Sequence, residues 1–159
     1  LENSINWIIK EMKKDGLENV QGQRVKVPTW IRGDEFISLL KPFNKEINML
    51  GIGCSIGTPH GGITGDLVVV DSFMELERIS KDLSGKILLF NVPFASYDEV
   101  FSYQYTGANR AAEYGVKATL IRSIGSWSMD NPHTGSMSYN NSIKKIPHAA
   151  ITIEDAMML

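Results

Sequence analysis

The sequence predicts a fold that mixes helices with short strands, and three observations support this class. Short apolar runs bounded by Gly, Asn or Asp indicate strands over residues 47–52 and 67–70. Ser-x-x-Glu capping boxes at Ser72 and Ser96 each open a helix. The second helix lies between apolar runs at 86–90 and 118–121, and this order predicts a parallel strand pair with a right-handed crossover.

The N-terminal segment reads as an amphipathic helix followed by a strand. Residues 1–15 place Ile5, Ile9 and Met12 on one helical face, and Gly16 stands where a left-handed cap would end the helix. Val25 and Val27 alternate with polar residues, which predicts a short strand over residues 24–27. A helix with one apolar face needs a partner on which to pack.

The remaining elements are bounded by glycines and by a long polar segment. The helix that opens at Ser72 is expected to end near Gly85, and the helix that opens at Ser96 is expected to end at Gly115. Residues 148–152 predict a further strand, and a helix begins at Glu154. Between them, residues 123–147 are rich in Gly, Ser, Asn and Pro, and a connection of this length usually indicates function or disorder.

Composition bounds the protein class. A chain of 159 residues with 43% hydrophobic residues suits one domain with a sizeable core. The formal charge of −2 is not gathered into a block, so we expect no nucleic-acid partner and no anionic membrane surface. No apolar run is long enough for a membrane span, and the single Cys54 cannot form an internal disulfide. A start without Met and an end inside a predicted helix suggest a fragment of a longer protein.

Ser55 lies in a Gly-x-Ser-x-Gly pattern, which in serine hydrolases places the nucleophile on a turn between a strand and a helix. Here the pattern is followed by residues 58–62, which contain Pro59 and two glycines and cannot form that helix. We interpret the pattern as a Gly-rich turn. A serine hydrolase would require a helix after Gly57 and a histidine near Ser55.

The sequence predicts no metal site in this chain. His60, His133 and His148 lie far apart, and no His-Glu-x-x-His or His-x-Asp motif is present. The acidic pairs, such as Asp98-Glu99, stand at predicted loop ends or helix starts, where solvated carboxylates are favoured.

The loop Asn131-Pro132-His133-Thr134-Gly135 has turn chemistry at every position and would hold an imidazole and a hydroxyl in a defined place. Arg122 and Ser123 end the preceding strand and begin the same long loop, so a cation suited to a carboxylate ligand could lie near His133. The alternative is a solvated surface turn. Asn140 begins an Asn-x-Ser pattern, which makes it a glycosylation candidate in a secreted chain.

Eight stretches, taken in order, resemble one known family. They are Asp15-Gly16-Leu17-Glu18, Trp30-Ile31-Arg32-Gly33, Ser55-Ile56-Gly57-Thr58-Pro59 with Gly62-Ile63-Thr64, Ser72-Phe73 with Glu75-Leu76, Gly85-Lys86-Ile87, Leu120-Ile121-Arg122-Ser123, Pro132-His133-Thr134-Gly135, and Ile146-Pro147 with Ile151-Thr152-Ile153-Glu154-Asp155-Ala156. These stretches resemble the carboxypeptidase Q family, also called plasma glutamate carboxypeptidase. The match runs in register over nearly the whole chain. So many motifs in one order make the resemblance specific.

In that family most of this region is the protease-associated domain, inserted into a zinc-dependent exopeptidase. The resemblance implies an α+β fold over residues 29–159: a small β-barrel-like or sandwich-like sheet flanked by helices and truncated in its last helix. Residues 1–28 would be a helix and a strand from the peptidase domain. Separated from that domain, the helix would expose its apolar face, to be covered by the peptidase domain or by a second copy in a homodimer.

The resemblance also implies a function. The parent protein would be secreted or lysosomal and would cleave dipeptides or short peptides with two zinc ions. Its zinc ligands and catalytic glutamate would follow the end of this chain, so we expect no cofactor and no catalytic residue here and no activity of the chain by itself. The loop with His133 and Thr134 would overhang the active-site cleft, with Arg122 and Ser123 near its base.

Two other functions remain open at this stage. A protease-associated domain can also be a non-catalytic module that binds proteins or peptides in the lumenal part of a receptor. Sequence after residue 159 would distinguish the two, since a His-x-Asp followed by paired Glu indicates the peptidase and a transmembrane run indicates the receptor. The serine hydrolase with Ser55 would be excluded by a loop after Gly57.

Overall fold

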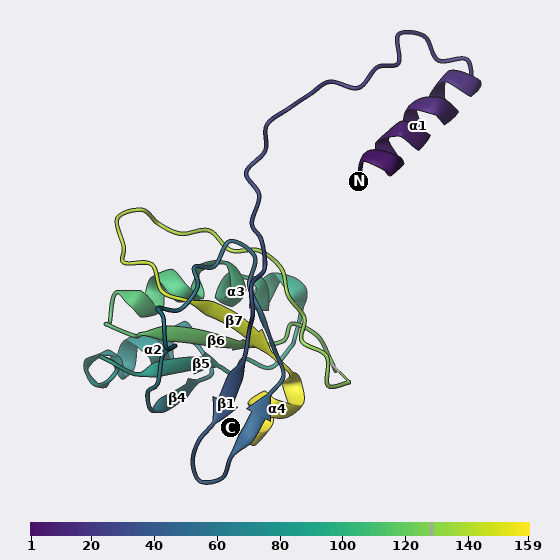
Figure 1. Cartoon of the computed structure of the whole chain (residues 1–159). Coiled ribbons are helices and arrows are strands. Elements are labelled where there is room, and N and C mark those ends of the chain that lie inside the picture. Colours follow the sequence, from purple (N-terminus) through teal and green to yellow (C-terminus); the bar gives the residue numbers. More distant parts are fainter. Residues whose placement is uncertain (128) are drawn as a thin grey trace.

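The protein is described here by a computed structural model that covers residues 1–127 and 129–159. Figure 1 shows a mixed sheet with helices on both sides and a separate N-terminal helix. The helices are α1 (Glu2–Lys14), α2 (Phe73–Arg78), α3 (Tyr97–Ala112) and α4 (Ile153–Met158), with a 3-10 turn at Ser80–Asp82. The strands are β1 (Ile37–Leu39), β2 (Lys45–Ile47), β3 (Met49–Gly51), β4 (Leu67–Val70), β5 (Ile87–Phe90), β6 (Ala118–Arg122) and β7 (His148–Ile151).

Five strands form one open sheet in the order β3-β7-β6-β5-β4. Strands β4 to β7 are parallel, with Leu88 opposite Thr119 and Thr119 opposite His148, and β3 pairs antiparallel with β7. The predicted parallel pair around the second helix is therefore confirmed, and so is the α+β class. The expected barrel-like shape is corrected to an open sheet, because in the described part of the chain β4 and β3 remain separate edges.

Alternation along β5 divides the core into two layers. Successive strand residues point to opposite faces, so Leu88 and Phe90 pack with α2 and α3, whereas Leu89 packs with the β1–β2 hairpin and α4. All three side chains are fully buried. The sheet is thus covered on both faces, which explains why its strands read as continuous apolar runs.

The predicted helix starts are confirmed at atomic level. Ser72 Oγ accepts a hydrogen bond from the Glu75 N–H at 3.1 Å, and Glu75 reaches back to the Asp71 N–H at 2.9 Å. Ser96 caps α3 in the same way through the Glu99 N–H at 3.4 Å. Gly115 follows α3 with φ of 77°, the left-handed conformation that favours glycine.

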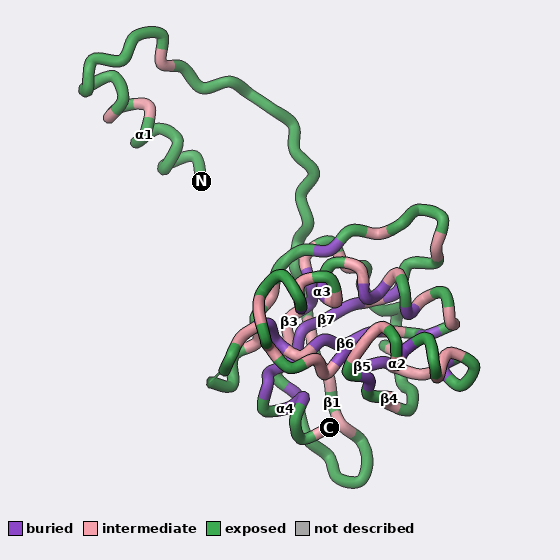
Figure 2. Tube along the Cα trace, turned by 180° about the vertical axis from the view of Figure 1, so that it is seen from behind, coloured by how far each residue is buried: buried purple, intermediate pink, exposed green. Residues whose placement is uncertain are grey.

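The N-terminal helix stands apart from the sheet on an extended segment (Figures 1 and 2). No residue of α1 is buried; Ile5 and Met12 of the predicted apolar face are exposed together with the neighbouring Ile8, whereas Ile9 is half-buried. The strand predicted over residues 24–27 is wrong: these residues are exposed and have no strand partner among the described residues. Alternation alone does not make a strand, because its backbone groups need a neighbouring strand with which to pair.

The apolar run at residues 47–52 is divided between β2 and β3, because the backbone of Asn48 forms hydrogen bonds with Asp155 and Thr152. Its N–H donates to the Asp155 carboxylate at 3.0 Å, and its carbonyl accepts from the Thr152 N–H at 3.3 Å. β2 therefore turns away into a hairpin with β1, in which Ile37 lies opposite Ile47. Lys45 of this hairpin also forms an ion pair with Asp155.

A substitution at Gly107 tests the contact between α3 and the sheet. A Cβ at Gly107 would lie 2.8 Å from Phe90 Cε2. Alanine normally stabilises a helix relative to glycine by about 1 kcal/mol, but here we expect Gly107→Ala to destabilise the fold by about 1–2 kcal/mol. Urea unfolding measures the change, and Ser102→Ala, on the exposed side of the same helix, is the control that should be slightly stabilising. A more stable Gly107→Ala variant would contradict this packing.

Candidate functional site

The loop with the predicted site residues is attached to the end of the sheet by a serine. The Ser123 hydroxyl donates to the Ile151 carbonyl at 2.7 Å and accepts from the His133 N–H at 2.8 Å. Ser123 is only 3% exposed. It is therefore an anchor for the loop backbone, and the structure brings two of the four predicted residues into direct contact.

The next residues of the loop lie along the edge of the sheet at β3. Thr134 donates its hydroxyl hydrogen to the Gly51 carbonyl at 3.1 Å. The Gly53 N–H donates to the Gly135 carbonyl at 2.7 Å, and the Met137 N–H donates to the Gly53 carbonyl at 3.0 Å. Gly135 also packs so closely on Gln104 of α3 that a side chain there would collide with the amide. The loop is thus fixed from three sides.

His133 remains exposed at the surface of this fixed loop. Its ring meets the ring of Tyr97 edge-on, with 6.4 Å between ring centroids. Tyr97 stacks on Phe101 and Phe101 on Tyr105, at 5.6 and 5.4 Å. The sequence analysis missed this row of rings, although aromatic residues spaced four apart in a predicted helix are the signal that would have found it.

Arg122 lies on the opposite face of the sheet from Ser123, as alternation along β6 requires. Its Nη1 contacts Asn91 Oδ1 at 3.4 Å, and the Asn91 amide donates to the Ala156 carbonyl of α4 at 3.0 Å. Arg122 is half-buried, and its Nε is buried without a hydrogen-bond partner within residues 1–127 and 129–159. The structure therefore places Arg122 at the same end of the sheet as His133 but on the side of α4.

Ser55 has a structural role that excludes the serine hydrolase. Its hydroxyl accepts from the backbone N–H of His148 at 2.8 Å and donates to the Ile56 carbonyl at 3.0 Å. The residues after Gly57 form a loop rather than a helix. The imidazole of His148 contacts Thr119 Oγ1 at 2.8 Å instead of Ser55. Among the residues that the structure describes, no base is therefore placed to activate this hydroxyl.

His148 is a buried histidine beneath the site loop. Burial lowers the pKa of His148 from 6.5 to about 4, and hydrogen bonding toward the backbone of Thr119, Gln104 and Tyr103 opposes the shift only in part. The ring Nε2 and both polar atoms of the Gln104 side chain are buried without hydrogen-bond partners in the described part of the chain. The imidazole is thus held neutral at physiological pH.

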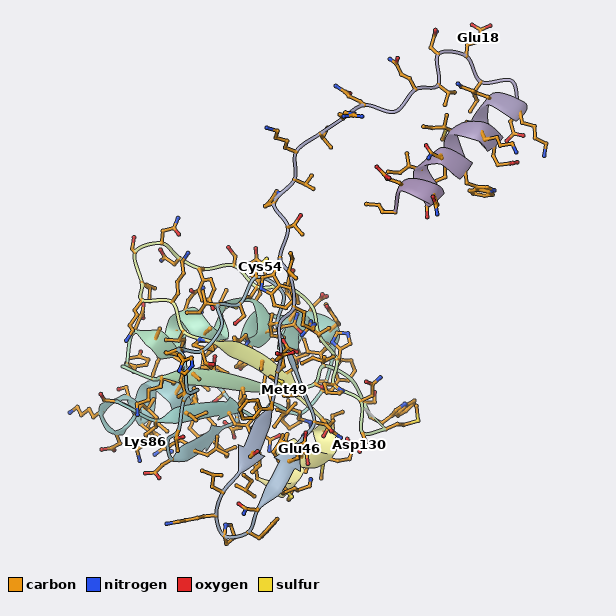
Figure 3. All side chains as sticks on the ribbon, in the orientation of Figure 1. Glu18, Glu46, Met49, Cys54, Lys86 and Asp130 are labelled. Carbon is orange, nitrogen blue, oxygen red and sulfur yellow. The ribbon has the colours of Figure 1, made fainter. Side chains whose placement is uncertain are left out.

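The extended N-terminal segment reaches the sheet through three residues that the sequence analysis did not select as functional. Trp30 Nε1 donates to the Ser55 carbonyl at 2.9 Å, and Arg32 lies over the Trp30 ring at 4.9 Å. Arg32 pairs with Glu35 at 2.7 Å and also donates to the Gly51 carbonyl, while Glu35 accepts the Gly51 N–H at 3.1 Å. These contacts cover the outer edge of β3. Figure 3 shows Cys54 near this junction, and Glu18 far out on the extended segment.

Neither a metal centre nor a membrane span is found in the described residues. Within residues 1–127 and 129–159, no group of three or more His, Cys, Asp and Glu residues could hold a metal ion. No helix in the same ranges is long and apolar enough to cross a membrane. Cys54 is an exposed free thiol. Asn140 is exposed, and its Oδ1 accepts the Ser142 N–H at 3.0 Å within a tight local turn.

Comparisons with known proteins agree on one group of peptidases. No protein-family model matches the chain. Carboxypeptidase Q from Mus musculus is 43% identical over 159 residues, which is all of this chain and 34% of that protein. The chain thus spans about a third of the length of the carboxypeptidase Q relatives that it matches.

Solved structures support the same relationship. The Peptidase M28 precursor from Shewanella amazonensis SB2B superposes with a TM-score of 0.90 and 31% identity, covering 99% of this chain and 37% of that chain. BSAP, a zinc aminopeptidase from Bacillus subtilis, superposes with a TM-score of 0.69 and 25% identity, covering 99% of this chain and 34% of that chain. The resemblance found in the sequence is confirmed: over all 159 residues this chain is homologous to carboxypeptidase Q, and its fold is that of the matching part of an M28 peptidase.

Proposed function

We propose that this chain is the accessory, protease-associated part of a zinc-dependent exopeptidase of the carboxypeptidase Q type, acting on dipeptides or short peptides. One observation carries the proposal: the chain matches carboxypeptidase Q along its whole length yet spans only 34% of it. The names of the relatives favour the peptidase over the receptor module. Since the described residues offer no group that fits a metal, the two expected zinc ions would be held by the remainder of the longer protein.

In this proposal residues 131–137 act as a fixed lid over the substrate cleft. The support is the attachment of the loop to Ser123, Gly51 and Gly53, which holds the backbone in one place while His133 stays exposed. A lid that is already ordered costs little entropy when substrate binds. It would limit the length of peptide that reaches the reacting atoms and would offer the imidazole of His133 as a hydrogen-bonding group.

We further propose that the peptidase domain covers the apolar face of α1. Exposed Ile5, Ile8 and Met12 indicate that this face needs a partner. Residues 1–35 form more than a fifth of the chain, and the match to the solved peptidase covers 99% of the chain, so it extends over this arm. Because the match to that longer protein extends over the arm, we prefer its own peptidase domain over a homodimer as the partner. A secreted or lysosomal location, with Asn140 as an accessible glycosylation position, belongs to the same proposal.

Replacing His133 tests the lid in the longer, zinc-loaded protein. We expect His133→Ala to lower kcat/KM for dipeptides about tenfold, which is the effect of removing one hydrogen bond to a charged group in the transition state. The control is His60→Ala, because His60 is an exposed histidine in the loop after the Gly-rich turn. An unchanged kcat/KM for His133→Ala would rule out the lid role.

A further inference from the structure

Arg122 is a cation held in place without a carboxylate. Within the described residues, the ion pairs of arginine join Arg32 to Glu35 and Arg78 to Glu75, and no Asp or Glu lies within 4.0 Å of Arg122. The side-chain hydrogen bond that Arg122 forms among these residues, to neutral Asn91, is long at 3.4 Å. A half-buried guanidinium is costly to desolvate, and such charges are normally paired.

The position of Arg122 is nonetheless well defined. It is the last residue of β6, opposite Ile151 of β7, so its backbone belongs to the centre of the sheet. Asn91, which follows β5, is fixed by its own backbone bond to Val70 and by its amide bond to Ala156 of α4. The Asn91 oxygen is thereby aimed at the guanidinium. Arg122 and Asn91 are therefore preorganised for binding a ligand.

The place of this pair in the sheet is one where ligands bind. Arg122 and Asn91 stand directly at the carboxyl ends of two adjacent parallel strands. In open sheets with parallel strands, ligands are bound beyond these ends. The anchored loop with His133 begins from the residue after Arg122, so both features face the same end of the molecule.

From this arrangement we infer that Arg122, positioned by Asn91, binds the free C-terminal carboxylate of a short peptide. This inference rests on the proposed function, since it names the chemical group by which the substrate or its product is recognised. The carboxylate forms charge-assisted hydrogen bonds with the guanidinium and supplies the missing counter-charge. A peptide with an amidated C-terminus lacks that charge and binds weakly.

The test is a titration of this 159-residue chain, followed through the side-chain Nε–H resonances of arginine by NMR. The probes are alanyl-alanine, the same dipeptide as its C-terminal amide, and acetate. We expect alanyl-alanine and acetate to shift the Arg122 resonance in a saturable way, and the amide to bind at least about tenfold more weakly. Arg122→Gln should abolish the saturable effect, and Arg110→Gln, which replaces an exposed arginine of α3, should leave it intact. Equal binding of the dipeptide and its amide, or no saturable shift of Arg122, would overturn the inference.

A second measurement shows whether the carboxylate that Arg122 binds belongs to the peptide or to the rest of the protein. It also tests the carboxylate site independently of the proposed lid. In the longer protein, Arg122→Gln should raise KM for dipeptides about tenfold with little change of Tm. A lower Tm with an unchanged KM would mean that an Asp or Glu of the remaining polypeptide pairs with Arg122, and the inference would be wrong. If His133→Ala leaves kcat/KM unchanged while alanyl-alanine still binds at Arg122, the lid fails and the carboxylate site stands.

Discussion

Lowering the pH from 6.5 to 4 is expected to remove about 3 kcal/mol of folding stability through His148 alone. The imidazole is 2% exposed, and burial lowers its pKa from 6.5 to about 4. In the unfolded chain the same ring takes up a proton below pH 6.5, whereas the folded chain resists this until about pH 4. The stabilisation is therefore complete above pH 6.5 and is lost progressively as the pH falls toward 4.

Urea unfolding at pH 7, 6, 5 and 4 measures this dependence. Carboxylates also titrate at the acidic end, so the wild-type chain is compared with His148→Phe, which keeps a buried ring that cannot be protonated. We expect the difference in free energy of unfolding between the two chains to change by about 3 kcal/mol over the range. His60→Asn, which removes an exposed histidine, should give a curve parallel to the wild type. A parallel curve for His148→Phe would show that His148 is not held neutral by the fold.

Protonation of His148 is also expected to affect the site loop at residues 131–137. The backbone of His148 bonds to Ser55 and Ile52, and the hydrogen-bonding groups of Gly53 hold the loop at Gly135 and Met137. A charged imidazole beneath these contacts loosens the turn and the loop together. Acid is therefore expected to act on the site before it unfolds the whole sheet.

Asp155→Ala is expected to destabilise the fold by about 3 kcal/mol, the second large effect. The carboxylate is 3% exposed, pairs with Lys45 and accepts the Asn48 N–H at 3.0 Å. Removing it leaves that N–H without a partner and separates the β1–β2 hairpin from α4. Because the Lys45 side chain is 41% exposed and can be solvated, most of the cost arises at Asn48 and in the hairpin contact.

Urea unfolding and hydrogen exchange check this result. Asp155→Asn retains an acceptor for Asn48 and should lose about half as much stability. Glu46→Ala, an exposed carboxylate on β2 beside Lys45, is the control and should be nearly neutral. Faster exchange in Asp155→Ala should appear in β2 and α4 together. Faster exchange spread evenly over the sheet would instead show that Asp155 does not connect these two elements specifically.

The local features of the fold were predictable because their causes lie within a few residues. The capping boxes at Ser72 and Ser96 set the starts of α2 and α3, and the left-handed glycine at position 115 follows the end of α3. The run at 67–70 was predicted with the bounds that β4 has in the structure. The predicted strand at 24–27 failed for the opposite reason, since its alternation has no neighbouring strand to pair with.

In the candidate site, too, the local turn was predictable from the sequence, whereas the contacts between distant residues were not. Turn residues around His133 predicted a fixed loop, but its attachment to Ser123 and Gly51 joins residues 10 and 83 positions apart. The sequence analysis grouped Arg122 with His133, whereas alternation along β6 turns Arg122 toward Asn91 and α4. Which face a strand residue occupies depends on what packs on each side of the sheet.

By itself, the sequence determined the capped helix starts, most of the strands, the α+β class and the relationship to carboxypeptidase Q, because capping, turn and apolar patterns are properties of short segments. The end of α2 was not among them, since this helix stops at Arg78 rather than near Gly85. The tertiary structure alone decided the open sheet, the neutral buried His148, the contact of Arg122 with Asn91 and the ion pair of Lys45 with Asp155, 110 positions apart. Each of these depends on burial or on contacts between distant segments, which appear only when the chain has folded.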